Sequence, residues 1–271
     1  MEPVLKLVPL SSIELQEEAE SERLKNLVEA FRKSQTLKDP PIVASGLGKK
    51  LIQLDGTNRI NVLRKLGCSH VVVQVVDYHD TSSVLIKSWV HVSKVNKQEF
   101  LKKLKMLPKV ETESFKIGLG VTLTGHPLAA ASIIFRDGNG LSIFSNSDLI
   151  RRVKLMRSVV KLYGQLIERD RQVTIESMAQ LSEFFTKHKD KNVALFFPSF
   201  SSHEIYSLLE KGITLPTGIT RHVINGRALR INYPIAMLGK GVTEREKQNY
   251  FKNFLKNLNL RFYEESTFVV E

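Results

Sequence analysis

A nearly unbroken run of β-branched residues, Val71 to Val76, is the sequence feature that most limits how this chain can fold. Valine is favoured in strands, and a run without polar alternation is typical of a strand buried on both faces. The residues just before it, 57–66, carry Ile60, Leu63 and Leu66 at helical spacing. A buried strand next to an amphipathic helix indicates an α+β (mixed α/β) fold.

The same two patterns recur along the whole chain. Apolar alternation and turn residues predict further strands at 5–8, 42–44, 51–54, 85–92, 129–135, 140–144, 193–197 and 228–234. Helical spacing and capping residues predict helices from Ser21, at 97–106, 147–169 and 174–187, after Ser201, and at 243–258. The pattern changes near residues 93–110, so we expect two modules, 1–95 and 96–271.

Composition limits the partners and the compartment. The formal net charge of +12 favours an anionic partner, and nucleic acid, nucleotide phosphates and an anionic membrane are all consistent with it. The lysines and arginines are scattered, as on an ordinary solvated surface. A single cysteine, Cys68, excludes an internal disulfide, and no apolar run approaches the roughly 20 residues of a membrane span. With no secretory signal visible, we expect a cytoplasmic protein.

The strongest local motif is Leu54-Asp55-Gly56-Thr57-Asn58-Arg59, where a strand ends and a helix begins. Helix N-termini bind phosphate because their first amides lack intrahelical partners and the helix dipole is positive there. Arg59 can add a charged contact to a phosphate, and Asp55 can hold a metal or accept a proton. By composition alone, the motif is also consistent with an ordinary strand–helix turn.

Three further patches carry polar or aromatic side chains suited to a site. Glu17, Glu18 and Glu20 precede a helix, where acids either favour the helix N-terminus or supply a general base. Trp89 is a core residue or the wall of a pocket, with His91 facing the same way. The segment Thr217 to His222 is predicted to be a loop whose Thr, Arg and His side chains can bind a carboxylate or a phosphate.

Several common catalytic motifs are missing from the sequence. It contains no GxxxxGK[ST] phosphate loop and no protein-kinase signature. It also lacks GxSxG, HExxH and CxxC motifs, which argues against hydrolase and zinc chemistry.

Together, these patches resemble the free L-serine kinases of the ParB/sulfiredoxin superfamily. The similarity rests on Ile52 to Arg59, on Leu63 to Gly67, and on the order of a glutamate, a DGxxR turn, a tryptophan strand and a Thr-Arg-His segment. It implies a ParB/sulfiredoxin-like N-terminal module, a second α/β module, and transfer of a phosphoryl group from ATP or ADP to free L-serine. Mg²⁺ is the implied cofactor, and no protein metal ligand is assigned.

The resemblance also implies a role for each matched residue. Glu17 is the general base, in preference to Glu20, and Asp55 assists it or positions the metal and phosphate. The residues implied to bind the nucleotide phosphates are Gly56, Thr57, Asn58 and Arg59. Those implied to bind the amino acid or the transferred phosphate are Trp89, Thr220, Arg221 and His222.

Asn58 departs from the family, which usually has histidine at that position. Asparagine donates hydrogen bonds but carries no charge, so a degenerate nucleotide sensor remains an alternative. A second alternative is a ParB-like nucleotide-dependent DNA-binding regulator. The net charge supports it, but there is no convincing helix-turn-helix pattern. Nucleic acid is therefore an open partner that is not favoured, and no membrane partner is expected.

Overall fold

The computed structural model describes residues 2–46, 48, 50–108, 110–118, 126, 128–145, 148–163, 167–171 and 173–261, excluding the side chains of 21–23. These residues form two compact units. Unit 1 comprises Met1–Leu15, Ala19–Val84 and Ile224–Glu271, and unit 2 comprises Gln16–Glu18 and Leu85–Val223. The chain therefore enters unit 2 for three residues early on and returns to unit 1 at its end.

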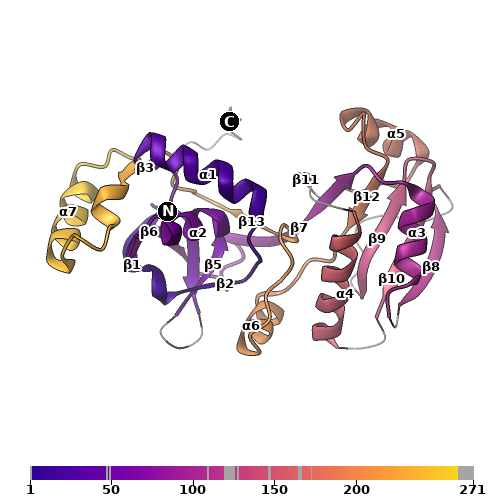
Figure 1. Cartoon of the computed structure of the whole chain (residues 1–271), viewed down its shortest axis with the longest axis horizontal. Coiled ribbons are helices and arrows are strands. Elements are labelled where there is room, and N and C mark those ends of the chain that lie inside the picture. The colour runs from indigo at the N-terminus through magenta and orange to yellow at the C-terminus, as the bar shows by residue number, and fades with distance from the viewer. Residues whose placement is uncertain are drawn as a thin grey trace. The chain divides into compact units, whose positions relative to one another are not determined.

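Unit 1 is built on a five-stranded mixed sheet with the order β1-β6-β4-β5-β2 (Figure 1). The valine-rich strand β6 pairs antiparallel with β1 and parallel with β4, while β5 pairs antiparallel with β4 and parallel with β2. As predicted, β6 lies inside the sheet, and Val71, Val72 and Val73 are fully buried. The strands are β1 (Val4–Pro9), β2 (Ile13–Leu15), β4 (Ile42–Ser45), β5 (Leu51–Asp55) and β6 (His70–Val76).

Three helices complete unit 1: α1 (Ser21–Ser34), α2 (Thr57–Lys65) and α7 (Glu244–Lys256). Ile60, Val62 and Leu63 of α2 are fully buried in one cluster with β1 and β6. The same cluster includes Phe251 of α7, which explains why the end of the chain belongs to this unit. A short pair, β3 (Thr36–Leu37) with β14 (Tyr233–Pro234), also ties the C-terminal segment to unit 1.

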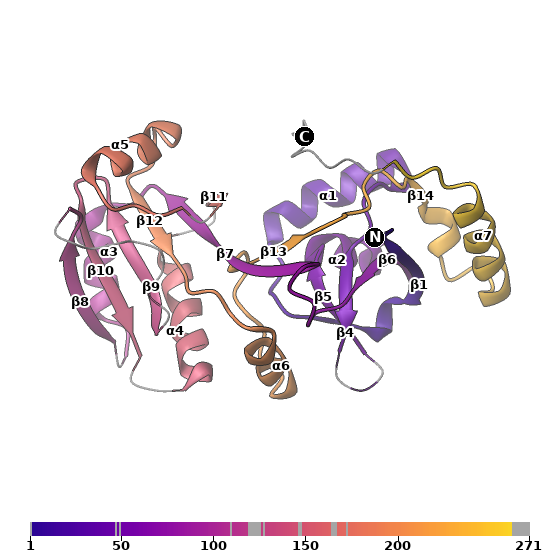
Figure 2. The ribbon, with the colours of Figure 1, turned by 180° about the vertical axis from the view of Figure 1, so that it is seen from behind.

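Unit 2 contains a seven-stranded sheet with the order β11-β7-β12-β9-β10-β8, and β13 also pairs with β7 (Figures 1 and 2). Its interior strands β9 and β12 are buried along their whole length. The strands are β7 (Val84–Ser93), β8 (Glu111–Lys116), β9 (Ala129–Phe135), β10 (Asn139–Phe144), β11 (Glu168–Arg171), β12 (Val193–Phe196) and β13 (Thr220–Ile224).

The helices of unit 2 begin at polar caps, and the cap predicted at Ser201 is confirmed. Ser201 forms a reciprocal capping box with Glu204, and Ser177 forms one with Gln180. Each satisfies amides that a helix start leaves unpaired. The helices are α3 (Lys97–Lys105), α4 (Leu149–Leu162), α5 (Met178–Lys187) and α6 (Ser202–Glu210).

Three sequence-based predictions differ from the structure. The helix expected at 147–169 ends at Leu162, and Glu168–Arg171 instead forms the edge strand β11; residues 147 and 164–166 lie outside the described residues. The strand expected at 228–234 is reduced to Tyr233–Pro234, because Arg230 and Asn232 have the left-handed φ values of +55° and +51°. The expected loop at 217–222 becomes strand from Thr220 onward.

The predicted division at residue 95 also differs from the two units found. The chain passes from one unit to the other on either side of residues 16–18, near residue 84 and near residue 224. Such exchanges depend on long-range pairing that a local pattern does not carry. Within the described part of the chain, no helix combines the length and apolarity needed to cross a bilayer.

Candidate functional site

The Asp55–Arg59 motif forms the strand–helix turn that its sequence predicts. Strand β5 ends at Asp55, Gly56 adopts a left-handed φ of +94°, and α2 begins at Thr57 without a side-chain cap. The N–H of Ile60 donates to the carbonyl of Gly56 at 3.0 Å, so the amides of Thr57, Asn58 and Arg59 precede the helical ladder. This is the backbone arrangement that binds phosphate at a helix N-terminus.

Gly56 is required by this turn for two reasons. Its φ of +94° is costly for any residue with a side chain. In addition, a Cβ at this position would lie 3.0 Å from both Cβ of Pro41 and Nε of Arg59. A side chain here would displace the guanidinium that the turn presents.

Asp55 is held by two arginines of unit 1. One carboxylate oxygen accepts from Nη2 of Arg59 at 2.7 Å and also from Arg227. Burial opposes ionisation of Asp55, but the charges and hydrogen bonds of Arg59 and Arg227 outweigh it and lower the pKa of this carboxyl. Asp55 is therefore an ionised anchor that orients Arg59, which also donates to the carbonyl of Asp39 at 2.9 Å.

Asn58 makes a contact that connects the turn to the start of α1. Its Oδ1 accepts the backbone N–H of Glu20 at 3.3 Å. Glu20 is the N-cap residue of α1, so the amide side chain satisfies a donor at that helix start.

In unit 2, Glu17 is enclosed by the segment around Gly218. Its Oε1 accepts from the backbone N–H of Thr220 at 2.7 Å and from the Thr220 hydroxyl, and its Oε2 accepts from the N–H of Gly218 at 3.2 Å. The backbone next to it is also paired: Leu215 donates to the carbonyl of Gln16 at 2.7 Å and accepts from Glu18 at 3.0 Å. The carboxylate is thus fixed in both position and orientation.

Burial raises the pKa of Glu17 above its ordinary value. Hydrogen bonds from Thr220 and Gly218 and the positive charge of Arg169 act in the opposite direction without cancelling the effect of burial. A carboxylate with a raised pKa is a stronger base than an exposed one, which suits it to accept a proton from a hydroxyl.

A buried chain of hydrogen bonds holds Gly218 from the other side. His91, which is fully buried, lies 2.7 Å through Nε2 from the carbonyl of Gly218 and 2.7 Å through Nδ1 from the Tyr163 hydroxyl. Because a carbonyl only accepts, Nε2 carries the proton and Nδ1 accepts from Tyr163. Burial lowers the pKa of His91 to about 3, which keeps the ring neutral.

The remaining predicted residues lie on β7 and β13. The guanidinium of Arg221 lies over the Trp89 ring, 5.0 Å from its centroid. The backbone N–H of Trp89 donates to the carbonyl of Ile219 at 3.0 Å. His222 is buried, with Nδ1 3.4 Å from Nε2 of Gln16. Trp89, Arg221 and His222 thus belong to the same pair of strands as Thr220.

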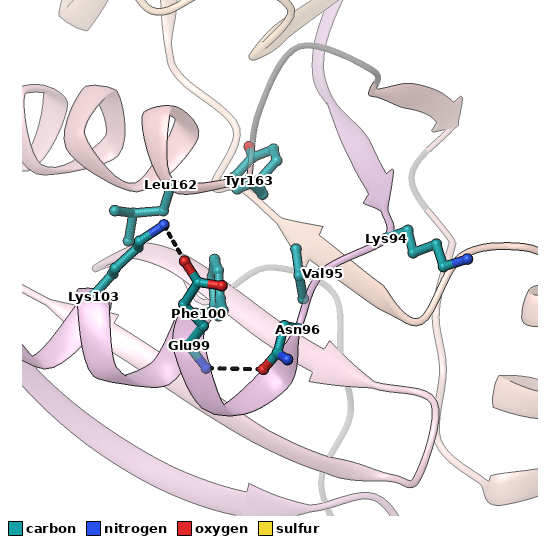
Figure 3. Close-up of a pocket in the computed structure, with 8 residues that line it drawn as sticks. All are labelled: Lys94, Val95, Asn96, Glu99, Phe100, Lys103, Leu162 and Tyr163. Atoms are coloured by element: carbon teal, nitrogen blue, oxygen red, sulfur yellow. Dashed lines mark hydrogen bonds and ion pairs between the residues drawn. The ribbon is translucent and has the colours of Figure 1, made fainter.

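Unit 2 also contains a separate cavity of about 210 Å³. Figure 3 draws the residues that line it. Its lining contains none of the predicted site residues. Tyr163 is the lining residue that also takes part in the chain to Gly218. The other lining residues are Lys94, Val95, Asn96, Glu99, Phe100, Lys103 and Leu162.

The described residues do not fit a magnesium ion held by the protein alone. Among them, no three His, Cys, Asp or Glu side chains are clustered suitably for a metal. Asp55 is engaged by two arginines, and Glu17 by Thr220 and Gly218. Magnesium in nucleotide sites is often bound by one or two carboxylates together with substrate phosphates, and both candidate carboxylates already have protein partners.

The structure therefore gathers the predicted residues into two groups, one in each unit. Unit 1 carries Asp55 to Arg59, and unit 2 carries Glu17, Trp89 and Thr220 to His222. Sequence reasoning missed Arg227, Tyr163 and Arg169, and it included Gly218 in the polar segment 217–222 without giving it a role of its own. The glycine in the polar motif was the available signal for Gly218, whereas Tyr163 and Arg169 fell inside a helix predicted to be too long.

The protein is of the α+β class, with a helix N-terminus of the kind that binds phosphate in unit 1 and a partly buried, hydrogen-bonded carboxylate in unit 2. No family model matches the chain. It is, however, 28% identical to the ATP-dependent L-serine kinase SbnI of Staphylococcus aureus over 274 residues, covering 98% of this chain and 97% of that protein.

Solved structures show the same fold. A C-terminally truncated SbnI from Staphylococcus aureus superposes with a TM-score of 0.71 at 22% identity, over 93% of this chain and 96% of the other. Free serine kinase in complex with AMP gives a TM-score of 0.68 at 16% identity, over 88% and 95% of the two chains. These similarities confirm the α+β fold and the predicted resemblance to the free L-serine kinases.

Proposed function

We propose that this chain phosphorylates free L-serine, using ATP or ADP as the phosphoryl donor, to give O-phospho-L-serine. The observation that carries the proposal is the setting of Glu17, a carboxylate oriented by Thr220 and Gly218 whose pKa is raised by burial. Similarity to SbnI over nearly the whole of both chains supports the choice of serine as acceptor and favours ATP as donor.

In the proposed reaction, Glu17 takes the proton from the serine hydroxyl as the hydroxyl oxygen attacks the terminal phosphorus. The bond from that phosphorus to its bridging oxygen breaks, and the leaving group is ADP from ATP or AMP from ADP. The product is O-phosphoserine, and the proton passes from Glu17 to solvent. A magnesium ion bound to the nucleotide would neutralise charge on the phosphates, with no protein ligand assigned to it.

The nucleotide phosphates are proposed to bind the backbone amides at Gly56 to Asn58 and the Arg59 guanidinium. Asp55 keeps Arg59 in place through the 2.7 Å contact and is proposed to act by positioning. Thr220 already uses its N–H and hydroxyl on Glu17, so we propose that it orients the base. Trp89, Arg221 and His222 are proposed to surround the amino acid.

The direct test is to incubate the purified chain with L-serine, Mg²⁺ and either ATP or ADP, and to detect O-phosphoserine by mass spectrometry. Product with at least one donor is expected. If neither donor gives product while nucleotide still binds, the chain is instead a nucleotide sensor or a DNA-binding regulator. In the regulator case, DNA affinity would fall steeply with salt concentration and would not depend on Glu17.

A further inference from the structure

We propose that Arg169 binds the α-carboxylate of the amino-acid substrate. This inference rests on the proposed function, because it names how the same site recognises its acceptor. Nothing in the sequence motifs pointed to this residue, since it fell at the end of a predicted helix.

The position of Arg169 places its charge against the segment that holds Glu17. Strand β11 pairs antiparallel with β7 at the end of the sheet (Figure 2). In this pairing, Arg169 is directly opposite His91. An ideal Cβ on Gly218 would lie 2.1 Å from Nε of Arg169, so the guanidinium occupies the space that a side chain at Gly218 would need. The N–H of the same glycine donates to Glu17.

Arg169 is presented on a strand that is anchored from its other face. The neighbouring residues Glu168 and Asp170 both contact the ring of His188, at 2.6 Å to Nδ1 and 3.1 Å to Nε2. Because side chains alternate along a strand, these two acids point away from the face that carries Arg169. The contacts with His188 therefore hold the strand on one face, while the guanidinium of Arg169 lies against Gly218 on the other. The side chain of Arg169 as a whole is partly exposed, although its Nε is buried.

The proposed role of Arg169 follows from the two negative charges that meet in the reaction, those of the base and of the substrate carboxylate. L-Serine carries a carboxylate close to its hydroxyl, and a base that takes the hydroxyl proton must come near that carboxylate. Two like charges at short distance disfavour both substrate binding and ionisation of the base. A guanidinium beside the base offsets this repulsion and matches a carboxylate with two parallel hydrogen bonds. In line with this, the charge of Arg169 lowers the pKa of Glu17.

The test compares L-serine with L-serinamide, which keeps the hydroxyl and amine but lacks the carboxylate. The measured quantity is the ratio of kcat/KM for serine to kcat/KM for serinamide. The wild-type chain is expected to prefer serine, and Arg169→Gln to lose about tenfold to hundredfold with serine and little with serinamide. Arg169→Lys, which keeps the charge without the planar fork, should retain part of the preference. Arg151→Gln, an exposed arginine of α4, is the matched control and should leave the ratio unchanged.

Two outcomes would overturn the inference. If the wild-type chain did not prefer serine to serinamide, it would not recognise the carboxylate, and Arg169 could not have this role. Equal losses with both substrates in Arg169→Gln, with the preference unchanged, would place Arg169 on the phosphoryl group or on the base instead. A wild-type chain that forms no phosphoserine would contradict the proposed function itself, so the two failures are distinguishable. Circular dichroism of each variant separates loss of recognition from misfolding, and Arg169→Lys carries the test if Arg169→Gln does not fold.

Discussion

The Glu17 carboxylate accepts the backbone N–H of Thr220 at 2.7 Å, although the two residues are 203 positions apart in the chain. The Thr220 hydroxyl donates to the same oxygen. One residue thus supplies two of the hydrogen bonds that hold the proposed base and limit how far burial raises its pKa.

Replacing Thr220 by valine should move the pH dependence of the reaction. The hydroxyl bond lowers the pKa of Glu17, so its loss raises that pKa further. Because the base must be ionised, the rising acidic limb of kcat/KM should shift to higher pH. Thr220→Ser keeps the hydroxyl and should stay close to the wild type. A limb that stays in place in Thr220→Val would show that this bond does not tune the base.

Gly56→Ala should weaken nucleotide binding, and Gly67→Ala is its matched control. Both glycines have left-handed φ values, +94° and +76°, so each alanine should cost about 1 kcal/mol of stability. Only at Gly56 would the added Cβ approach Pro41 and Arg59; at Gly67 it would meet nothing within 4 Å. Calorimetric titration with ADP should show lost affinity in Gly56→Ala alone. Equal affinities in the two variants would contradict a phosphate site at this turn.

Tyr163→Phe should destabilise unit 2 by leaving Nδ1 of His91 buried without a donor. An unsatisfied buried polar atom costs about 1–3 kcal/mol. Tyr233→Phe is the matched control, because within the described residues the Tyr233 hydroxyl has no hydrogen-bond partner. Its removal should be nearly neutral. Scanning calorimetry of both variants checks this, and similar effects would argue against a structural hydrogen bond from Tyr163 to His91.

The neutral state of His91 predicts how stability depends on pH. The pKa of His91 is about 3 in the fold, below its ordinary value of 6.5, so its contribution is complete above pH 6.5 and is lost as pH falls toward 3. Between pH 7 and pH 5, this residue alone should account for about 2 kcal/mol of lost unfolding free energy.

Urea unfolding followed by the fluorescence of Trp89, the one tryptophan in the sequence, reports on the same unit as His91. His91→Gln should show a smaller loss of stability between the two pH values than the wild type. The same loss in both proteins would mean that His91 is not neutral in the fold.

The parts of the structure that local patterns encode were predictable from the sequence. The valine strand β6, the turn at Gly56 and the capped start of α6 each depend on residues within a short window. The exchange of residues 16–18 into unit 2 was not predictable, because it depends on pairing between Gln16 and Leu215. The choice of Glu17 over Glu20 came from the family resemblance together with the spacing of Glu17 from the first strand.

Other features of the site were hidden by competing local signals. Arg169 and Tyr163 follow an amphipathic helix whose apolar spacing suggested that it continued. Arg227 lies in a segment predicted to lead into a strand, whereas the left-handed residues Arg230 and Asn232 break that strand. The contact from Arg227 to Asp55 joins residues 172 positions apart, which no local pattern reports.

The central claim is that Glu17 is the base for phosphoryl transfer to serine, and replacing it by glutamine tests this most directly. Glutamine has nearly the same shape and cannot take the proton, so the rate of O-phosphoserine formation should fall by about 10²- to 10⁴-fold. Nucleotide affinity and the circular dichroism spectrum should be unchanged. If Glu17→Gln formed phosphoserine at the wild-type rate, with the same donor and the same pH dependence, the account would be contradicted.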